Sequence, residues 1–172
     1  MSTNLYLVRH GIAVNLGENG VRFDADRMLS EEGLEKTRIV ACGLKQLVGG
    51  EVQRIVSSPY CRARQTADII SDVFGKAMEV ELADELAAGE DVHGQLRWLR
   101  KQKAVPTIAV GHMPDLALIA SFLISGGDRA SVEFKKAAVA GIVFPREFAV
   151  GAGCLQWLLP PLVLRRLARK AE

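Results

Sequence analysis

Two histidines and two arginines follow apolar runs of the sequence and are the side chains best suited to chemistry. Arg9 and His10 come directly after Leu5–Val8, and Arg62 and His112 come after two later apolar runs. A histidine in a rigid setting serves as a nucleophile or a proton carrier. A guanidinium binds phosphate or carboxylate oxygens through two directed donors and keeps its charge. These residue types together favour the binding and transfer of an anionic group.

Each of these groups follows a segment with the composition of a buried strand. The segments are 5–8, 52–56 and 107–110, and turn residues or a glycine end each of them. Parallel strands release their next residues at the carboxyl edge of a sheet, where open α/β proteins bind ligands. We therefore expect the following residues to meet at one edge: Arg9, His10, Gly11, Ser57, Ser58, Pro59, Arg62, Gly111 and His112.

The remaining pattern alternates helices with strands. Segment 12–29 is polar and irregular, and it is expected to lie over the site. Strands that alternate with helices imply a three-layer α/β/α sandwich, whose central sheet is mostly parallel with an antiparallel strand. Helical apolar spacing predicts helices between Ser30 and Gly49, at 61–74, around 96–99, at 116–124 and at 162–171. A short strand is expected at 78–82, and an antiparallel pair at 138–144 and 154–158.

Length and composition fit one globular domain that spans residues 1–172. A net charge of +2 gives no support for nucleic acid or an anionic membrane as a partner. Cys42, Cys61 and Cys154 match neither a disulfide framework nor a zinc motif and are expected to be reduced thiols. Because neither a secretory signal nor a membrane span is predicted, a cytoplasmic location is expected.

Two other phosphate chemistries lack their sequence motifs. Cys61 is not followed by the CxxxxxR loop of cysteine phosphatases, and no GxxxxGK[ST] motif of P-loop NTPases occurs. The converging arginines and histidines contain no obvious set of metal ligands. We therefore expect metal-independent chemistry without a cofactor.

Four short motifs follow one another along the chain. They are Arg9-His10-Gly11, the stretch with Asp24, Arg27, Leu29, Ser30 and Gly33, the block 57–67 (SSPYCRARQTA), and Val110-Gly111-His112. In this order and spacing they resemble the histidine phosphatase superfamily, and within it the small bacterial phosphohistidine phosphatases of the SixA type. The resemblance covers nearly the whole chain and implies a phosphoglycerate mutase-like fold.

The resemblance implies a phosphohydrolase in which His10 attacks phosphorus and forms a phosphohistidine enzyme intermediate that water hydrolyses. Arg9, Arg62 and His112, together with Gly11, would bind the phosphoryl group and stabilise the charge of the transition state. This division of work requires a neutral His10 beside a protonated His112.

An acidic residue is the least specific part of the resemblance. Glu85 lies where the family often places one and is the candidate general acid, and its neighbours Asp84 and Glu90 are substitutes. Ser57 is a candidate for a supporting hydrogen bond. A phosphohistidine leaving group depends less on a strong acid than an alkoxide does. The weak assignment of an acid therefore favours phosphoramidate substrates.

About fifty residues separate Arg62 from His112, the size of a βαβ unit and a loop, without the inserted segments of longer relatives. A comparatively open site is therefore expected. Openness favours a phosphorylated protein as substrate, such as a histidine-containing phosphotransfer domain or a phosphocarrier. Two alternatives stay open: a broad phosphomonoesterase that acts on small esters, and a non-catalytic module that binds phosphate. The second alternative explains the pair of histidines less well, because binding alone does not require His10.

Overall fold

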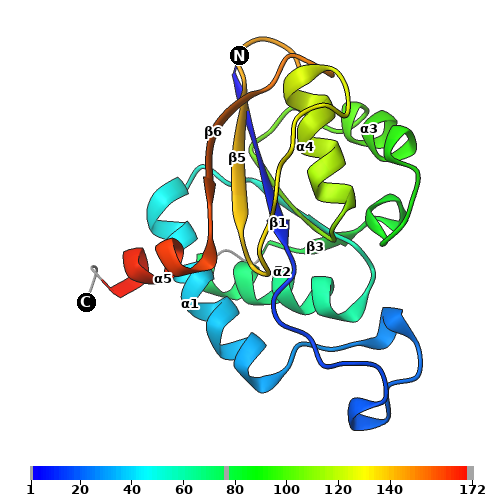
Figure 1. Cartoon of the computed structure of the whole chain (residues 1–172). Helices are drawn as coiled ribbons and strands as arrows, with labels where there is room; N and C mark the ends of the chain where they lie inside the picture. Colours follow the sequence, from blue (N-terminus) through cyan, green and yellow to red (C-terminus); the bar gives the residue numbers. More distant parts are fainter. Residues whose placement is uncertain (1, 76–77, 170–172) are drawn as a thin grey trace.

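The computed structural model describes residues 2–75 and 78–169. In that part of the chain, one central sheet has the strand order β3-β2-β4-β1-β5-β6 (Figure 1). Strands β1 to β4 are parallel, β5 runs antiparallel to β1, and β6 pairs antiparallel with β5. The predicted sheet, mostly parallel with an antiparallel strand, is thus confirmed. The strands are β1 (Thr3–Arg9), β2 (Arg54–Ser57), β3 (Val80–Leu82), β4 (Thr107–Gly111), β5 (Val139–Phe144) and β6 (Cys154–Leu159).

Helices cover both faces of this sheet and complete the three layers (Figure 1). Side chains alternate along β1, so Tyr6 and Val8 pack into one apolar core, and Leu5 and Leu7 pack into the other. The first core is closed by α1 (Glu31–Val48), α2 (Cys61–Phe74) and α5 (Pro161–Arg169). The second is closed by α3 (Val92–Arg100) and α4 (Asp115–Ser125).

The ends of the elements follow local chemistry. The Ser30 hydroxyl accepts the Gly33 N–H (3.0 Å) and caps α1, whereas Gly49 follows the last residue of that helix. Strand β3 is shorter than the predicted 78–82. Of the predicted helix 162–171, positions 170 and 171 lie outside the described residues.

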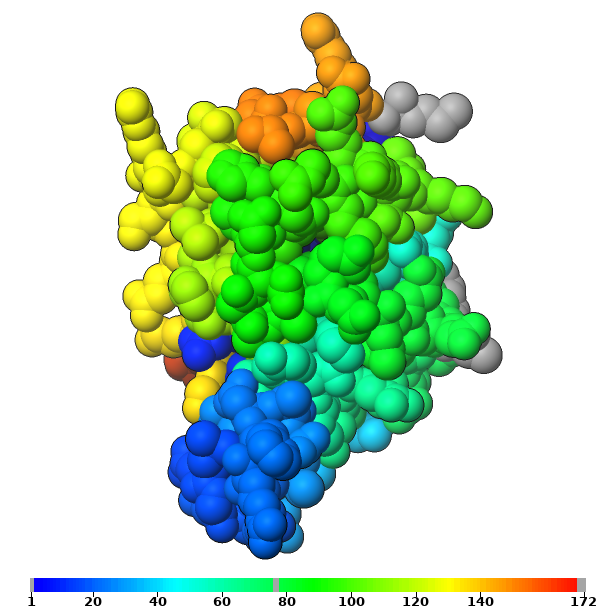
Figure 2. All heavy atoms as spheres, turned by 90° about the vertical axis from the view of Figure 1, so that its right-hand side faces the viewer, coloured from blue at the N-terminus to red at the C-terminus, as the bar shows by residue number. Residues whose placement is uncertain are grey.

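Segment 12–29 forms a lobe beside the carboxyl ends of the strands (blue in Figure 2). It contains two short 3-10 turns, η1 (Glu18–Gly20) and η2 (Asp24–Asp26). The last residue of the lobe is hydrogen-bonded to α2, because the Leu29 N–H donates to Oε1 of Gln65 on that helix (2.7 Å). Its side chains are therefore held near the first turns of α2.

Two further observations bear on the expectations from composition. Cys42, Cys61 and Cys154 are free thiols. Among the helices of the described residues, none is both long enough and apolar enough to cross a membrane.

Candidate active site

The carboxyl ends of β1 and β4 bring His10 and His112 together. The His10 N–H donates to the Gly111 carbonyl (3.1 Å), which holds the two strand ends in register. The two imidazole rings lie 5.1 Å apart between centroids, and Nε of Arg62 lies 3.2 Å from Nε2 of His10. The tertiary structure therefore brings together three groups that are separated by 52 and 50 positions in the sequence.

Hydrogen bonds define the tautomer of His10. Its Nε2 receives a hydrogen bond from Arg62, and because a guanidinium has no acceptor, Nε2 carries the lone pair. The proton then resides on Nδ1, which donates to the Gly11 carbonyl (2.7 Å). A histidine held in this way presents Nε2 as a nucleophile.

The surroundings also keep His10 uncharged. Burial is the main cause that lowers its pKa from 6.5 to about 3. The positive charges of Arg62 and Arg9 act in the same direction, and the hydrogen bond to Gly11 opposes them. His10 is therefore neutral near pH 7.

Gly11 is held against α1 and α2. A Cβ atom at this position would lie 2.3 Å from Oγ1 of Thr37, so a side chain does not fit without a shift. The Gly11 N–H also donates to Oγ1 of Thr66 (3.1 Å). These contacts fix the carbonyl that orients the His10 ring.

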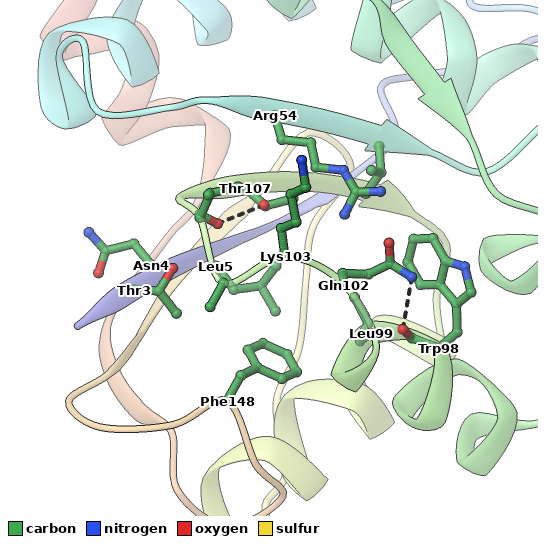
Figure 3. A pocket seen from close by; sticks show the side chains of 13 residues that line it. Thr3, Asn4, Leu5, Arg54, Trp98, Leu99, Gln102, Lys103, Thr107 and Phe148 are labelled. Atoms are coloured by element: carbon green, nitrogen blue, oxygen red, sulfur yellow. Dashed lines mark hydrogen bonds between the residues drawn. The ribbon is translucent and has the colours of Figure 1, made fainter. Parts of the chain in front are cut away.

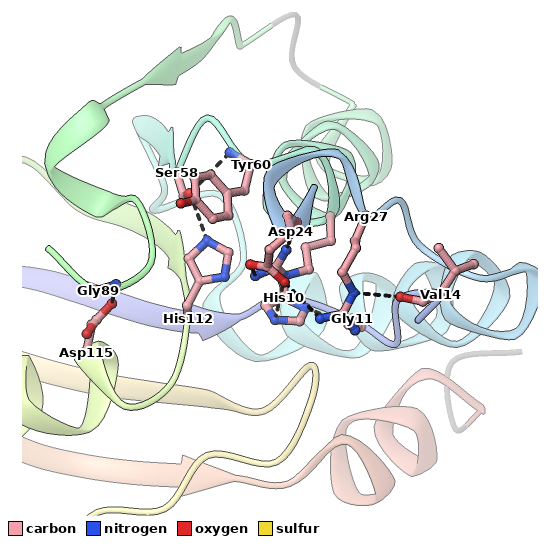
Figure 4. A network of polar contacts seen from close by, with 11 residues as sticks. His10, Gly11, Val14, Asp24, Arg27, Ser58, Tyr60, Gly89, His112 and Asp115 are labelled. Carbon is pink, nitrogen blue, oxygen red and sulfur yellow. Dashed lines mark hydrogen bonds and ion pairs between the residues drawn. The ribbon is translucent and has the colours of Figure 1, made fainter. Parts of the chain in front are cut away.

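Arg62 is oriented from three directions. It lies in the first turn of α2. In addition to the bond from Nε to His10, its Nη1 donates to the Asp24 carbonyl (2.6 Å), and its Nη2 donates to Oδ2 of Asp24 (2.8 Å). Burial alone would raise the pKa of Asp24, but Arg27 and Arg62 outweigh it, and the pKa lies below its usual range. The lobe thus places the Asp24 carboxylate on Arg62, and Figure 4 shows Asp24 beside His10.

His112 is held by the turn after β2. Its Nε2 lies 2.8 Å from Oγ of Ser58, which also accepts the Tyr60 N–H (3.2 Å). Nδ1 of His112 is buried and has no hydrogen-bond partner among the described residues. Burial, and after it the charge of Arg62, lowers the pKa of His112 to about 4. In the protein alone His112 is neutral at pH 7, and only a bound anion would favour the protonated form that the sequence argument requires.

Arg9 joins the same cluster through its charge. Its half-buried guanidinium donates from Nη1 to the Phe134 carbonyl (2.6 Å). The charge of Arg9 lowers the pKa of His10 and of His112. Burial in turn lowers the pKa of Arg9 itself.

The other candidates take different positions. Ser57 is buried and donates to the Ser58 carbonyl (2.9 Å), and it is Ser58 that contacts His112. Glu85 is exposed on η3 (Asp84–Leu86), a short turn that begins directly after Ala83. The Ala83 N–H donates to the Ser57 carbonyl (2.9 Å), and this bond brings the start of η3 to the same edge of the sheet.

Three contacts of the site were not predicted from the sequence. Asp24 occurs in a quoted motif and Ser58 was expected at this edge of the sheet, but neither was assigned its contact with Arg62 or His112. Tyr60 occupies a variable position of its motif, yet its ring packs edge-on against His112 at 5.2 Å and lies 5.3 Å from the Arg62 guanidinium carbon. Only the folded chain shows this packing.

The side chains of the site are less accessible than the short connection between Arg62 and His112 suggests. The exposed fractions are 7% for His10, 4% for Arg62 and 2% for His112. The lobe and Tyr60 both lie against Arg62, and Tyr60 also packs against His112. Within the described residues, no group of three or more His, Cys, Asp or Glu side chains is arranged to hold a metal ion.

A second pocket lies at the opposite edge of the sheet (Figure 3). Thr3 of β1, Arg54 of β2 and Thr107 of β4 line it at the amino ends of their strands, together with Trp98 and Phe148. Its cavity of about 20 Å³ holds about one water molecule. This pocket is therefore separate from the two histidines.

Comparisons with known proteins agree with the fold. A model of the histidine phosphatase superfamily (branch 1) matches residues 5–103. An uncharacterized protein of Picosynechococcus sp. (strain ATCC 27264 / PCC 7002 / PR-6) is 34% identical over 141 residues, 80% of this chain and 83% of the relative. Phosphohistidine phosphatase SixA of Escherichia coli (strain K12) is 26% identical over 165 residues, 94% of this chain and 96% of the relative.

A solved structure has the same architecture. The protein histidine phosphatase SixA complexed with tungstate superposes with a TM-score of 0.79 at 24% identity, over 94% of this chain and 99% of that one. The solved structure shows the same fold, and the family model that matches describes a class of phosphatases. The chain belongs to the histidine phosphatase superfamily, and the resemblance predicted from the motifs is confirmed.

Acidification is expected to destabilise the folded chain. Because the pKa values of His10 and His112 are lowered from 6.5 to about 3 and about 4, the unfolded chain binds protons first as the pH falls. Each histidine then removes about 2 kcal/mol from the free energy of unfolding between about pH 7.5 and about pH 5. Urea unfolding at both pH values measures this loss.

The variant His112→Gln isolates the contribution of one histidine. In this variant the free energies of unfolding at the two pH values should differ by about 2 kcal/mol less than in the wild-type protein. His93→Gln changes an exposed histidine and should leave the difference as it is. An unchanged difference in His112→Gln would show that this ring titrates normally in the folded chain.

Proposed function

We propose that this chain, as one domain of residues 1–172, removes phosphate from phosphohistidine on a protein through a phosphohistidine intermediate on His10. The observation that carries the proposal is the neutral His10, whose Nε2 lone pair is held among the charges of Arg62 and Arg9. The name of the Escherichia coli relative, a phosphohistidine phosphatase, supports the substrate class.

The proposed reaction has two displacements at phosphorus. In the first, the other ring nitrogen of the substrate phosphohistidine has already taken a proton from solvent, Nε2 of His10 forms a bond to phosphorus, and the bond to the substrate imidazole breaks so that it leaves as a neutral ring. In the second, water attacks the phosphoenzyme, the bond from phosphorus to Nε2 breaks, and inorganic phosphate leaves. Both steps keep phosphorus at the same oxidation level and need no redox partner.

The neighbouring cations stabilise the charge that moves during these steps. Arg9 and Arg62 supply directed donors to the phosphoryl oxygens, and Asp24 orients Arg62 before the substrate binds. A phosphoryl dianion raises the pKa of the neighbouring His112, so that this ring donates a hydrogen bond in the complex. Guanidinium and imidazolium charges supply the stabilisation without a metal ion in this scheme.

The two candidate substrate classes differ in how strongly the leaving group needs a general acid, and this difference tests the proposal. We expect Glu85→Gln to lower kcat/KM for an alkyl ester, β-glycerophosphate, by about 10²-fold, because the alkoxide leaving group needs a proton. The same change should lower kcat/KM for a phosphorylated histidine-containing phosphotransfer domain less than about fivefold, because imidazole leaves more readily. Glu79→Gln, a change at an exposed glutamate before β3, is the matched control.

Wild-type protein should use the phosphohistidine domain with the larger kcat/KM of the two substrates. Hydrolysis of the ester with no action on the phosphohistidine domain would establish the phosphomonoesterase alternative instead. Both assays are carried out with EDTA, in which activity should persist. A loss that a divalent metal restores would refute the metal-independent scheme.

A further inference from the structure

A basic pocket lies beside the active site. It has a volume of about 340 Å³ and is formed where Arg9 at the end of β1 meets α1, α5 and the turn before β5. In Figure 1 these elements gather at the end of the sheet that carries the active site. The basic pocket is defined by its charged and polar lining: Arg9, Lys36, Thr37, Glu133, Lys135, Lys136 and Arg165.

The lining concentrates positive charge. Among the described residues, five lysines and arginines line the pocket against one carboxylate, Glu133, whereas the whole chain has a net charge of only +2. Glu32 forms an ion pair with Lys36 and compensates one of these charges. The pocket therefore keeps an excess of positive charge that an anionic group would stabilise.

A buried hydroxyl in the same pocket needs a partner. Thr37 is only 2% exposed, and its Oγ1 has no hydrogen-bond partner among the described residues. Nε of Arg9 is likewise buried without one. Buried polar atoms are nearly always hydrogen-bonded in folded proteins, so these two donors leave the wall of the pocket short of hydrogen-bond acceptors.

Arg9 connects this pocket with the catalytic histidines. Its guanidinium lowers the pKa of His10 and His112, and it also lines the basic pocket. Because Arg9 adjoins His10 in the chain and also lines the pocket, we expect the part of a substrate next to its phosphoryl group to face the pocket. That part is recognised best when it is negatively charged.

We propose that the basic pocket binds acidic side chains that lie next to the phosphohistidine on the surface of the protein substrate. This inference rests on the proposed function and specifies which phosphoproteins the enzyme prefers. Lys135 and Lys136 are exposed, and the cations come from separate segments. Flexible charges spread over an open surface fit several carboxylates of a protein better than one compact metabolite.

Two phosphohistidine peptides test the proposal, one flanked by Asp and Glu and one by Ser and Gln. Wild-type protein should have a kcat/KM about tenfold higher for the acidic peptide, and high salt should reduce this preference. The double variant Lys135→Glu/Lys136→Glu should lose the preference and keep its activity on p-nitrophenyl phosphate. Lys101→Glu/Lys103→Glu, at exposed lysines that line a separate pocket, is the matched control and should keep both.

The outcomes separate the two proposals. Equal use of both peptides by the wild-type protein, or an undiminished preference in Lys135→Glu/Lys136→Glu, would overturn the role of the basic pocket. If neither peptide is hydrolysed while p-nitrophenyl phosphate is, the proposed function fails.

Fluorescence anisotropy with His10→Ala and the two labelled peptides then still tests whether the basic pocket binds acidic side chains, because tighter binding of the acidic peptide must depend on Lys135 and Lys136. A carboxylated small ester that depends on these lysines when the peptides do not would assign the pocket to a metabolite.

Discussion

His10→Ala is expected to lower kcat at least about 10³-fold and to abolish the phosphorylated enzyme intermediate. The loss is large because no other described group offers a lone pair in the position of Nε2, which lies 3.2 Å from Nε of Arg62. The imidazole of His112 does not occupy this position, because its ring centroid lies 5.1 Å from that of His10 and its Nε2 is bonded to the Ser58 hydroxyl. Alanine also removes the ring that Gly11 orients.

Labelling with a radioactive phosphodonor measures this effect directly. Wild-type protein should give a label that is stable in alkali and labile in acid, and His10→Ala should give none. The matched control is His93→Ala on α3, which removes an exposed histidine and should leave labelling and turnover intact. Turnover by His10→Ala at the wild-type rate would refute the nucleophile assignment.

Arg62→Lys should lower kcat/KM by about 10²–10³-fold, although it keeps the positive charge. Lysine is a point charge on a flexible stem and cannot replace a planar fork that bonds His10 and Asp24 at once. The change also removes the donor that fixes the lone pair of His10 on Nε2. Both binding and attack on phosphorus should therefore suffer.

The neighbouring residue Arg64 provides a matched control. It lies on the same helix, its side chain is 61% exposed, and it is 3.9 Å from a carboxylate oxygen of Asp68. Arg64→Lys should keep nearly full activity, and urea unfolding of both variants shows whether the fold is preserved. Activity of Arg62→Lys above half of the wild-type value would show that the directed donors of Arg62 are not needed.

The neutral variant Arg62→Gln tests the charge of Arg62 through the pH profile of kcat/KM, which would stay unchanged if Arg62 had only a structural role. The charge of Arg62 lowers the pKa of His10 and of His112, so its removal should raise both values. The acid limb of the kcat/KM profile should then move to higher pH. An unchanged limb would separate Arg62 from the titration of these rings.

Local patterns in the sequence were sufficient to predict the layers of the fold. Apolar runs such as Leu5–Val8 and 107–110 become β1 and β4, because short runs of this kind fit a buried strand. Ser30 caps α1 as its side chain predicts. The start of β3 was predicted less well, because the ends of elements depend on contacts that local composition does not contain.

The sequence by itself determined which residue types leave the strand ends: His10 after β1, Arg62 after the turn that follows β2, and His112 after β4. These follow from strand composition and from the motifs around them. Only the tertiary structure decided that Arg62 places the lone pair of His10 on Nε2, and that Asp24 lies on Arg62. It also decided that His112 is neutral in the protein alone. The reason is physical: tautomers and pKa values depend on burial and on charges brought together from distant parts of the chain, and no local pattern contains either.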